Sequence, residues 1–141
     1  MMLQSRSPAV GELRPTGIVL ASGSPRRREL MGRLLGGLPG HSPAQLVVEP
    51  ADVDETPLPG ESPTDLVERL AASKARAVSG DHPNALVVGA DTVVDIDGTI
   101  LGKPVDRQDA VEMLQRLSGR PHAVHTGIAL VGPGDATVQS W

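Results

Sequence analysis

The stretch Ile18-Val19-Leu20-Ala21-Ser22-Gly23-Ser24-Pro25 decides how the chain begins, because an apolar run leads straight into a glycine turn. The segment from Arg26 to Leu35 follows, and its larger apolar residues recur at helical spacing. The spacing therefore predicts a short strand, a tight turn and a helix.

The rest of the chain continues to alternate between strand and helix patterns. An acidic, proline-rich loop covers residues 49–60, and Asp97-Gly98 is typical of the turn of a β-hairpin. The predicted strands are 18–21, 45–48, 86–90, 93–95, 99–101, 122–131 and 136–141, and the predicted helices are 26–35, 62–78 (capped by Ser62) and 106–117 (capped by Asp106). This order predicts an α/β fold, a mixed twisted β-sheet flanked by helices.

The composition of the 141 residues excludes several classes of protein. Thirteen Lys and Arg against seventeen Asp and Glu give a net charge of −4, and Phe and Tyr are absent. A general nucleic-acid binder or a membrane protein is therefore not expected. Cysteine is also absent, which fits a reducing, cytoplasmic location. We expect residues 1–17 to be a flexible leader and residues 18–141 to form one domain.

The turn from Ser22 to Arg27 is the first candidate site. A strand that enters a helix through a glycine turn directs free backbone N–H groups at one point, and that point suits a phosphate. Arg26, Arg27 and Arg28 in the first helical turn oppose the helix dipole unless an anion binds there. The alternative is a Ser-Pro helix cap with solvated arginines.

Asp91 and Thr92 form the second candidate, directly after the apolar segment 86–90. We expect Asp91 at the carboxyl end of a buried strand, where open α/β sheets bind ligands. A carboxylate there can hold a divalent ion or orient a water, and Thr92 can add a hydroxyl contact. A turn or helix-cap Asp is the alternative.

Two lysines and an acidic loop complete the candidates. Lys74 lies within the apolar stripe of the helix 62–78, where a lysine must snorkel, pair or enter a polar cavity, and snorkelling is the commonest outcome. Lys103 follows the hairpin without the spacing of a Walker motif. The acidic stretch around Glu55 lacks calcium-loop spacing and is expected to be a solvated turn with one functional carboxylate. Together these groups favour metal-assisted chemistry on a polyphosphate.

The stretch from Leu20 to Leu30, which reads LASGSPRRREL, closely resembles the signature of the Maf family of nucleoside triphosphate pyrophosphatases. Further similar segments follow in order. They are Val53-Asp54-Glu55-Thr56, Arg69-Leu70-Ala71-x-x-Lys74-Ala75, Gly89-Ala90-Asp91-Thr92, Gly102-Lys103-Pro104, Leu117-Ser118-Gly119-Arg120 and His125-Thr126-Gly127. The resemblance implies an inosine triphosphate pyrophosphatase-like fold and hydrolysis of a nucleoside triphosphate to the monophosphate and pyrophosphate in the cytoplasm.

The resemblance also implies roles for single residues. Asp91 matches the family's proton acceptor, and Arg27 with Thr92 looks like the branch that acts on dTTP and UTP. A divalent cation, Mg²⁺, Mn²⁺ or Co²⁺, is implied near Glu55 and Asp91. The implied catalytic residues are Asp91, Lys74 and Glu55, the substrate-binding residues Ser22, Arg26, Arg27, Thr92 and Lys103, and the metal ligands Glu55 and Asp91.

Members of the family continue past the position of Trp141 through a segment with a Tyr-Gly-x-Gln-Gly-like stretch, which the resemblance leads us to expect is lacking here. Two alternatives therefore stay open: a non-catalytic nucleotide-binding or septum-formation regulatory protein, and an inactive truncated fragment. The predicted terminal strand also leaves a homodimer open.

Overall fold

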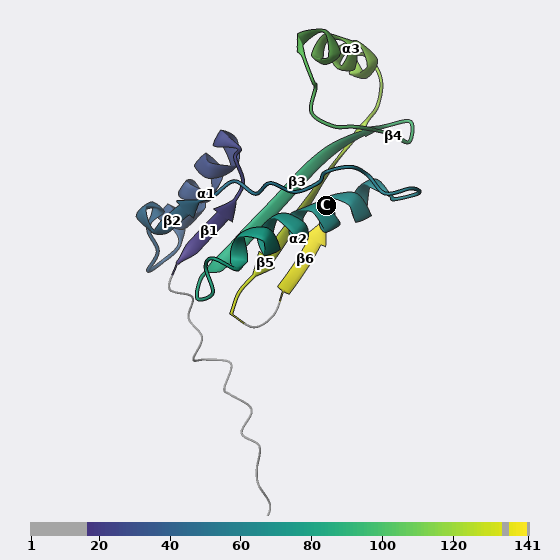
Figure 1. The fold of residues 1–141 in the computed structure, drawn as a ribbon. Coiled ribbons are helices and arrows are strands. Elements are labelled where there is room, and N and C mark those ends of the chain that lie inside the picture. The colour runs from purple at the N-terminus through teal and green to yellow at the C-terminus, as the bar shows by residue number, and fades with distance from the viewer. Residues whose placement is uncertain (1–16, 134–135, 141) are drawn as a thin grey trace, which may run out of the picture.

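The computed structural model describes residues 17–133 and 136–140, so the leader predicted for residues 1–17 lies almost wholly outside the described residues. Helices and strands alternate along the chain as Figure 1 shows. They are β1 (Ile18–Ala21), α1 (Pro25–Gly37), the 3₁₀ helix η1 (Pro43–Gln45), β2 (Leu46–Val48), α2 (Pro63–Ser79), β3 (Leu86–Ile96), β4 (Thr99–Leu101), α3 (Arg107–Leu117), β5 (Ala123–Val131) and β6 (Ala136–Ser140).

The strands form one mixed sheet in the order β2-β1-β3-β5-β6, with β4 attached to β3. Strands β1, β2 and β3 run parallel, whereas β4 and β5 pair with β3 in the antiparallel sense. The predicted α/β class is confirmed, as are the hairpin and the helix caps of Ser62 and Asp106. Asp97 and Gly98 both have positive φ, as a two-residue hairpin turn requires.

One predicted boundary is wrong, because β3 continues unbroken through Asp91 to Ile96. The sequence suggested two strands with a break after Ala90. Strand β5 pairs with β3 from Val87 to Asp95, and this ladder holds the backbone extended past the polar residues. Asp91 is therefore in the middle of a strand rather than at its end.

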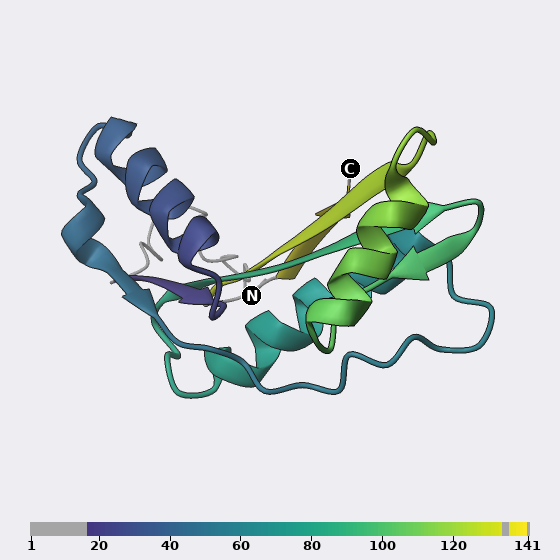
Figure 2. The same ribbon diagram turned by 90° about the horizontal axis from the view of Figure 1, so that it is seen from above.

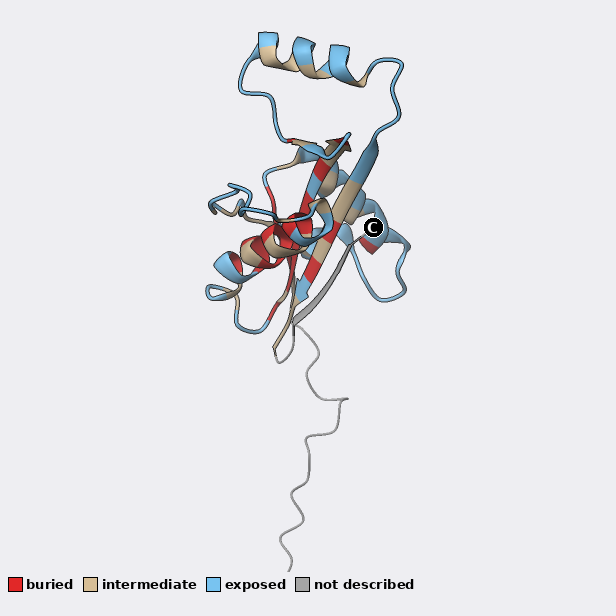
Figure 3. Ribbon diagram, turned by 90° about the vertical axis from the view of Figure 1, so that its right-hand side faces the viewer, coloured by how far each residue is buried: buried red, intermediate tan, exposed pale blue. Residues whose placement is uncertain are grey.

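Helix α2 packs unusually close to the sheet, and this contact makes the core. A Cβ on Gly89 would lie 2.1 Å from the carbonyl oxygen of Ala71, and one on Gly127 would lie 2.4 Å from that of Val67. Only glycine leaves room for the helix backbone at these two points. The buried face of α2 faces this sheet, as the red ribbon in Figure 3 shows, and consists of Leu66, Val67, Leu70, Ala71, Ala72, Lys74, Ala75 and Val78.

The other helices cover less of the sheet. Helix α1 lies on the face opposite α2 (Figure 2), and Leu35 is its one buried residue. Helix α3 stands clear of the sheet beyond β4, and none of its residues is buried (Figures 1 and 3). Within the described residues, no helix has both the length and the apolar character that a membrane crossing needs.

Candidate active site

The site lies in a notch in the sheet, on the edge of β3 that faces β1 and β4. Strand β1 pairs with β3 as far as Gly89, and β4 begins to pair at Val94. Residues 90–93 therefore have no partner strand on this edge within the described part of the chain. Asp91 lies in this notch, two residues past the end of the parallel pairing with β1, although β3 itself continues to Ile96.

The turn after β1 forms one wall of the notch. The Ser22 hydroxyl is buried and accepts the Ser24 N–H at 3.1 Å, while the Ser24 hydroxyl accepts the Arg27 N–H at 3.3 Å as the N-cap of α1. The Arg27 guanidinium donates to the carbonyl of Ala90 at 3.1 Å and so covers part of the open edge of β3. The Ser-Pro helix cap is therefore present, with Arg27 directed across the notch, and anion binding by this turn stays a prediction.

Lys74 is the centre of the site. Its Nζ lies 2.8 Å from Oδ1 of Asp91 and 2.8 Å from Oε1 of Glu55, and the first of these pairs is buried, with Lys74 5% and Asp91 7% exposed. Lys74 thus pairs instead of snorkelling. The reason is the close packing of α2 at Gly89, which brings the helix face that carries Lys74 against the strand that carries Asp91.

Glu55 approaches from the loop between β2 and α2, and its side chain is 44% exposed. The hydrogen bond from Lys74 lowers the pKa of the Glu55 carboxyl, and the charges of Lys74, Lys103 and Arg27 add to this effect, whereas burial opposes it. Glu55 is therefore an anion near neutral pH.

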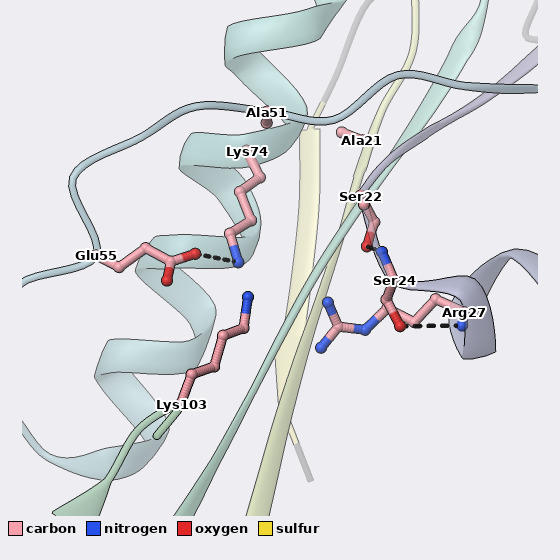
Figure 4. A pocket seen from close by; sticks show the side chains of 9 residues that line it. Ala21, Ser22, Ser24, Arg27, Ala51, Glu55, Lys74 and Lys103 are labelled. Atoms are coloured by element: carbon pink, nitrogen blue, oxygen red, sulfur yellow. Dashed lines mark hydrogen bonds and ion pairs between the residues drawn. The ribbon is translucent and has the colours of Figure 1, made fainter. Parts of the chain in front are cut away.

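These groups line a polar cavity of about 430 Å³, which Figure 4 shows from close by. In that view the amino groups of Lys74 and Lys103 approach the same space from α2 and from the segment after β4. The cavity is lined by Ala21, Ser22, Gly23, Ser24, Arg27, Ala51, Glu55, Lys74 and Lys103. The structure therefore brings Ser22, Arg27, Glu55, Lys74 and Lys103 together, with Asp91 bonded to Lys74.

A second cavity of about 430 Å³ lies on the α1 side of the sheet and has a largely apolar lining. Arg26 lines this cavity and not the polar one, although the arginine turn led us to expect it beside the phosphates. Arg27 lines both cavities and donates to the Thr92 hydroxyl at 3.3 Å, so Arg27 and Thr92 meet at the polar end of the apolar cavity.

Thr126 also belongs to this group; it lies in the segment His125-Thr126-Gly127 that resembles the family, but no site role was expected for it. Its hydroxyl lies 3.0 Å from that of Thr92, on the neighbouring strand β5, and it lines the same cavity. The register Thr92↔Thr126 pairs them directly. The contact between Thr126 and Thr92 follows from this register and not from a local sequence pattern.

Comparison with known proteins agrees with this geometry. The profile of the Maf family, described as "Maf-like protein", matches residues 17–141. The dTTP/UTP pyrophosphatase of Symbiobacterium thermophilum is 54% identical over 114 residues, which are 81% of this chain and 55% of that protein. The dTTP/UTP pyrophosphatase of Myxococcus xanthus is 47% identical over 123 residues, 87% of this chain and 59% of that protein. The chain thus spans a little over half the length of these curated relatives.

A solved structure supports the fold alone. The Staphylococcus aureus Ham1 protein superposes with a TM-score of 0.58 at 17% identity, over 88% of this chain and 68% of that one. The fold implied by the resemblance is confirmed in this way. Since the family profile covers nearly the whole described chain, the protein belongs to the Maf family.

Proposed function

We propose that the protein hydrolyses nucleoside triphosphates, dTTP and UTP first among them, to the monophosphate and pyrophosphate. The observation that carries the proposal is the cavity in which Arg27 and Lys103 lie beside the buried Lys74–Asp91 pair. The relatives named dTTP/UTP pyrophosphatase support the choice of substrate.

The charges of the cavity suit a polyphosphate that arrives with a divalent cation. Arg27, Lys74 and Lys103 face the two carboxylates of Glu55 and Asp91, which leaves one net positive charge for a ligand that carries several negative ones. Additional positive charge is needed, and a metal ion supplies it.

Glu55 and Asp91 supply only part of the ligand set that a divalent metal ion needs. Within the described residues there is no cluster of three or more His, Cys, Asp or Glu side chains that could hold an ion without help. Mg²⁺, however, is commonly held by one or two carboxylates together with substrate phosphates. Glu55 and Asp91 both bind the Lys74 ammonium and are the residues that would hold the ion together with a phosphate. The ion would neutralise phosphate charge and activate water when bound.

The remaining chemistry belongs to the side chains. Asp91 accepts Lys74 at Oδ1, which leaves Oδ2 to orient a water and take its proton as the water attacks phosphorus. The hydrogen bond from Lys74 fixes the position of the Asp91 carboxylate, and Lys103 and Arg27 neutralise the charge of the departing pyrophosphate. The Ser22 and Ser24 hydroxyls line the cavity, and each accepts a backbone N–H, which leaves its own O–H to donate to a phosphate oxygen.

Base preference is assigned to the second cavity. Its lining is largely apolar, and the Arg27–Thr92 pair places donors at one end, which is the arrangement expected for a flat base with polar edges. We further propose a cytoplasmic location, where nucleoside triphosphates are made and used. A homodimer through β6, an edge strand of the described sheet, stays a prediction that size-exclusion chromatography tests.

Pyrophosphate release tests the proposal directly. The chain is incubated with dTTP, UTP, CTP, ATP, GTP and modified triphosphates in the presence of Mg²⁺ or Mn²⁺, beside the Asp91→Asn variant. Asp95→Asn is the matched control, because Asp95 lies on the same strand and lines neither of the two cavities described in the site. We expect turnover in the wild type and in the control but not in Asp91→Asn.

Two results would contradict this proposal. If the wild type releases no pyrophosphate from any nucleotide, the chain is not an active pyrophosphatase, and tight binding without turnover would then favour the nucleotide-binding alternative. If Asp91→Asn keeps full activity, Asp91 is not the base.

A further inference from the structure

The loop between β2 and α2 presents Glu55 to Lys74 without any helix or strand to hold it. The loop runs from Glu49 to Ser62, and 3₁₀, α and β structure are all absent from this described segment. A loop of this kind would let the Glu55 carboxylate occupy many positions. Something else must therefore place it 2.8 Å from Lys74.

Arg69 of α2 supplies the main attachment. Its Nε donates to Oε2 of Glu61 at 2.6 Å and its Nη2 to Oε1 of Glu61 at 2.9 Å, so the pair is bidentate. The same Nη2 donates to the carbonyl of Thr56 at 3.1 Å. Arg69 thus binds the loop at two points, one of them directly after Glu55.

Two hydrogen bonds within the loop add to this attachment. Oε1 of Glu61 accepts the Leu58 N–H at 3.1 Å, and Asp54 accepts the Thr56 N–H at 3.0 Å. The Glu61 side chain is only 7% exposed, and the hydrogen bonds from Arg69 hold its pKa below the usual value. The guanidinium of Arg69 therefore holds the loop at Thr56, next to Glu55, and again at Glu61.

Arg69 and Lys74 lie five positions apart on one helix. The helix that presents the ammonium group to Asp91 consequently also fixes the loop that brings the second carboxylate. A change in the attachment would shift Glu55 relative to Lys74 without touching either residue.

We propose that Arg69 is a positioning residue of the active site, which acts through Glu55 by holding the Thr56 carbonyl and the Glu61 carboxylate. The inference rests on the proposed function for its role in catalysis. An arginine is required because its planar fork binds a carboxylate with two hydrogen bonds and still reaches a third acceptor, whereas a lysine acts as a point charge.

A double-mutant cycle between Arg69→Lys and Glu55→Gln tests this inference. Arg69→Lys should lower kcat for dTTP hydrolysis by roughly tenfold to a hundredfold with a smaller change in KM. In the Glu55→Gln background, Arg69→Lys should lower kcat by less than about twofold, because residue 55 no longer carries a carboxylate to position. Arg76→Lys is the matched control, since Arg76 is exposed on the same helix and its side chain has no hydrogen bond in the described part of the chain.

Hydrogen exchange gives a readout that does not depend on turnover. Arg69→Lys should speed exchange of the Thr56 and Leu58 amides and leave the amides in the middle of α2 unchanged. If Arg69→Lys does not fold, Glu61→Gln weakens the same pair from the loop side and replaces it in the cycle.

The outcomes separate the inference from the proposed function. Two results would overturn the role of Arg69 while the wild type still hydrolyses dTTP. One is a kcat of the double variant that falls by the product of the two single-variant losses, and the other is unchanged hydrogen exchange at the Thr56 and Leu58 amides. If the wild type shows no turnover, the proposed function fails, and the cycle is measured on the Kd of a non-hydrolysable dUTP analogue. If the wild type shows no turnover and also does not bind the analogue, both the inference and the proposed function are refuted.

Discussion

Gly89→Ala is the substitution that most directly tests how the site is assembled. The added Cβ would lie 2.1 Å from the Ala71 carbonyl oxygen, 2.9 Å from the Ala75 nitrogen and 3.0 Å from the Ala75 Cβ. Two of these three atoms are helix backbone, so no side-chain rotation relieves the clash. Helix α2 must therefore retreat from β3 by about 1 Å.

The magnitude follows from this displacement. Forced overpacking costs about 3 kcal/mol at the upper end of its usual range, which for a chain of this length lowers Tm by roughly 10 °C. The same shift separates Lys74 from Asp91, whose hydrogen bond is 2.8 Å long. A displacement of about 1 Å at catalytic groups reduces activity by roughly a hundredfold.

Thermal unfolding followed by circular dichroism, together with pyrophosphate release, measures both effects. Gly32→Ala is the control, because Gly32 lies inside α1 with nothing within 4 Å of the new Cβ. Its free energy of unfolding should rise by about 0.5–1 kcal/mol, since alanine favours a helix over glycine. If Gly89→Ala unfolds at the wild-type temperature and keeps full activity, the close contact of α2 with β3 does not position the site.

Three further predictions follow. Lys74→Met should lower the free energy of unfolding by about 3–5 kcal/mol in urea titrations, because it leaves the buried Asp91 carboxylate unpaired, and a loss below 1 kcal/mol would contradict this. The stabilisation due to Glu55, measured as the difference from Glu55→Gln, should be complete above pH 4.5 and disappear as the pH falls through the lowered pKa of the folded state, so a difference that grows in acid would be the wrong sign. Gly98→Ala should cost about 1–2 kcal/mol because φ is +78° in the hairpin turn, whereas an unchanged urea midpoint would argue against that turn.

Much of the fold could be predicted because its signals are local. The caps at Ser62 and Asp106 and the Asp97-Gly98 turn each follow from the chemistry of a few neighbouring residues. The unbroken course of β3 could not be predicted in this way. The extended backbone at Asp91 depends on a ladder with β5, more than thirty positions further along the chain.

The candidate site shows the same division. Lys74 and Asp91 stand out from the sequence because each is a charge beside apolar residues, whereas Lys103 by itself is a loop lysine. Their mutual distances depend instead on how α2 settles on Gly89 and Gly127, which no local pattern encodes. Arg26 and Arg27 are adjacent in sequence, and only the structure shows that Arg27 lines both cavities whereas Arg26 lines the apolar one alone.

The notch at residues 90–93 has a consequence for redesign of the protein. Its length depends only on where β1 stops and where β4 starts along one continuous strand. Shortening β1 at its end or β4 at its start by one residue pair would lengthen the opening, and extending either strand would shorten it. The opposite edge of β3 would remain hydrogen-bonded to β5. The size of the acceptable ligand can therefore be engineered separately from the core.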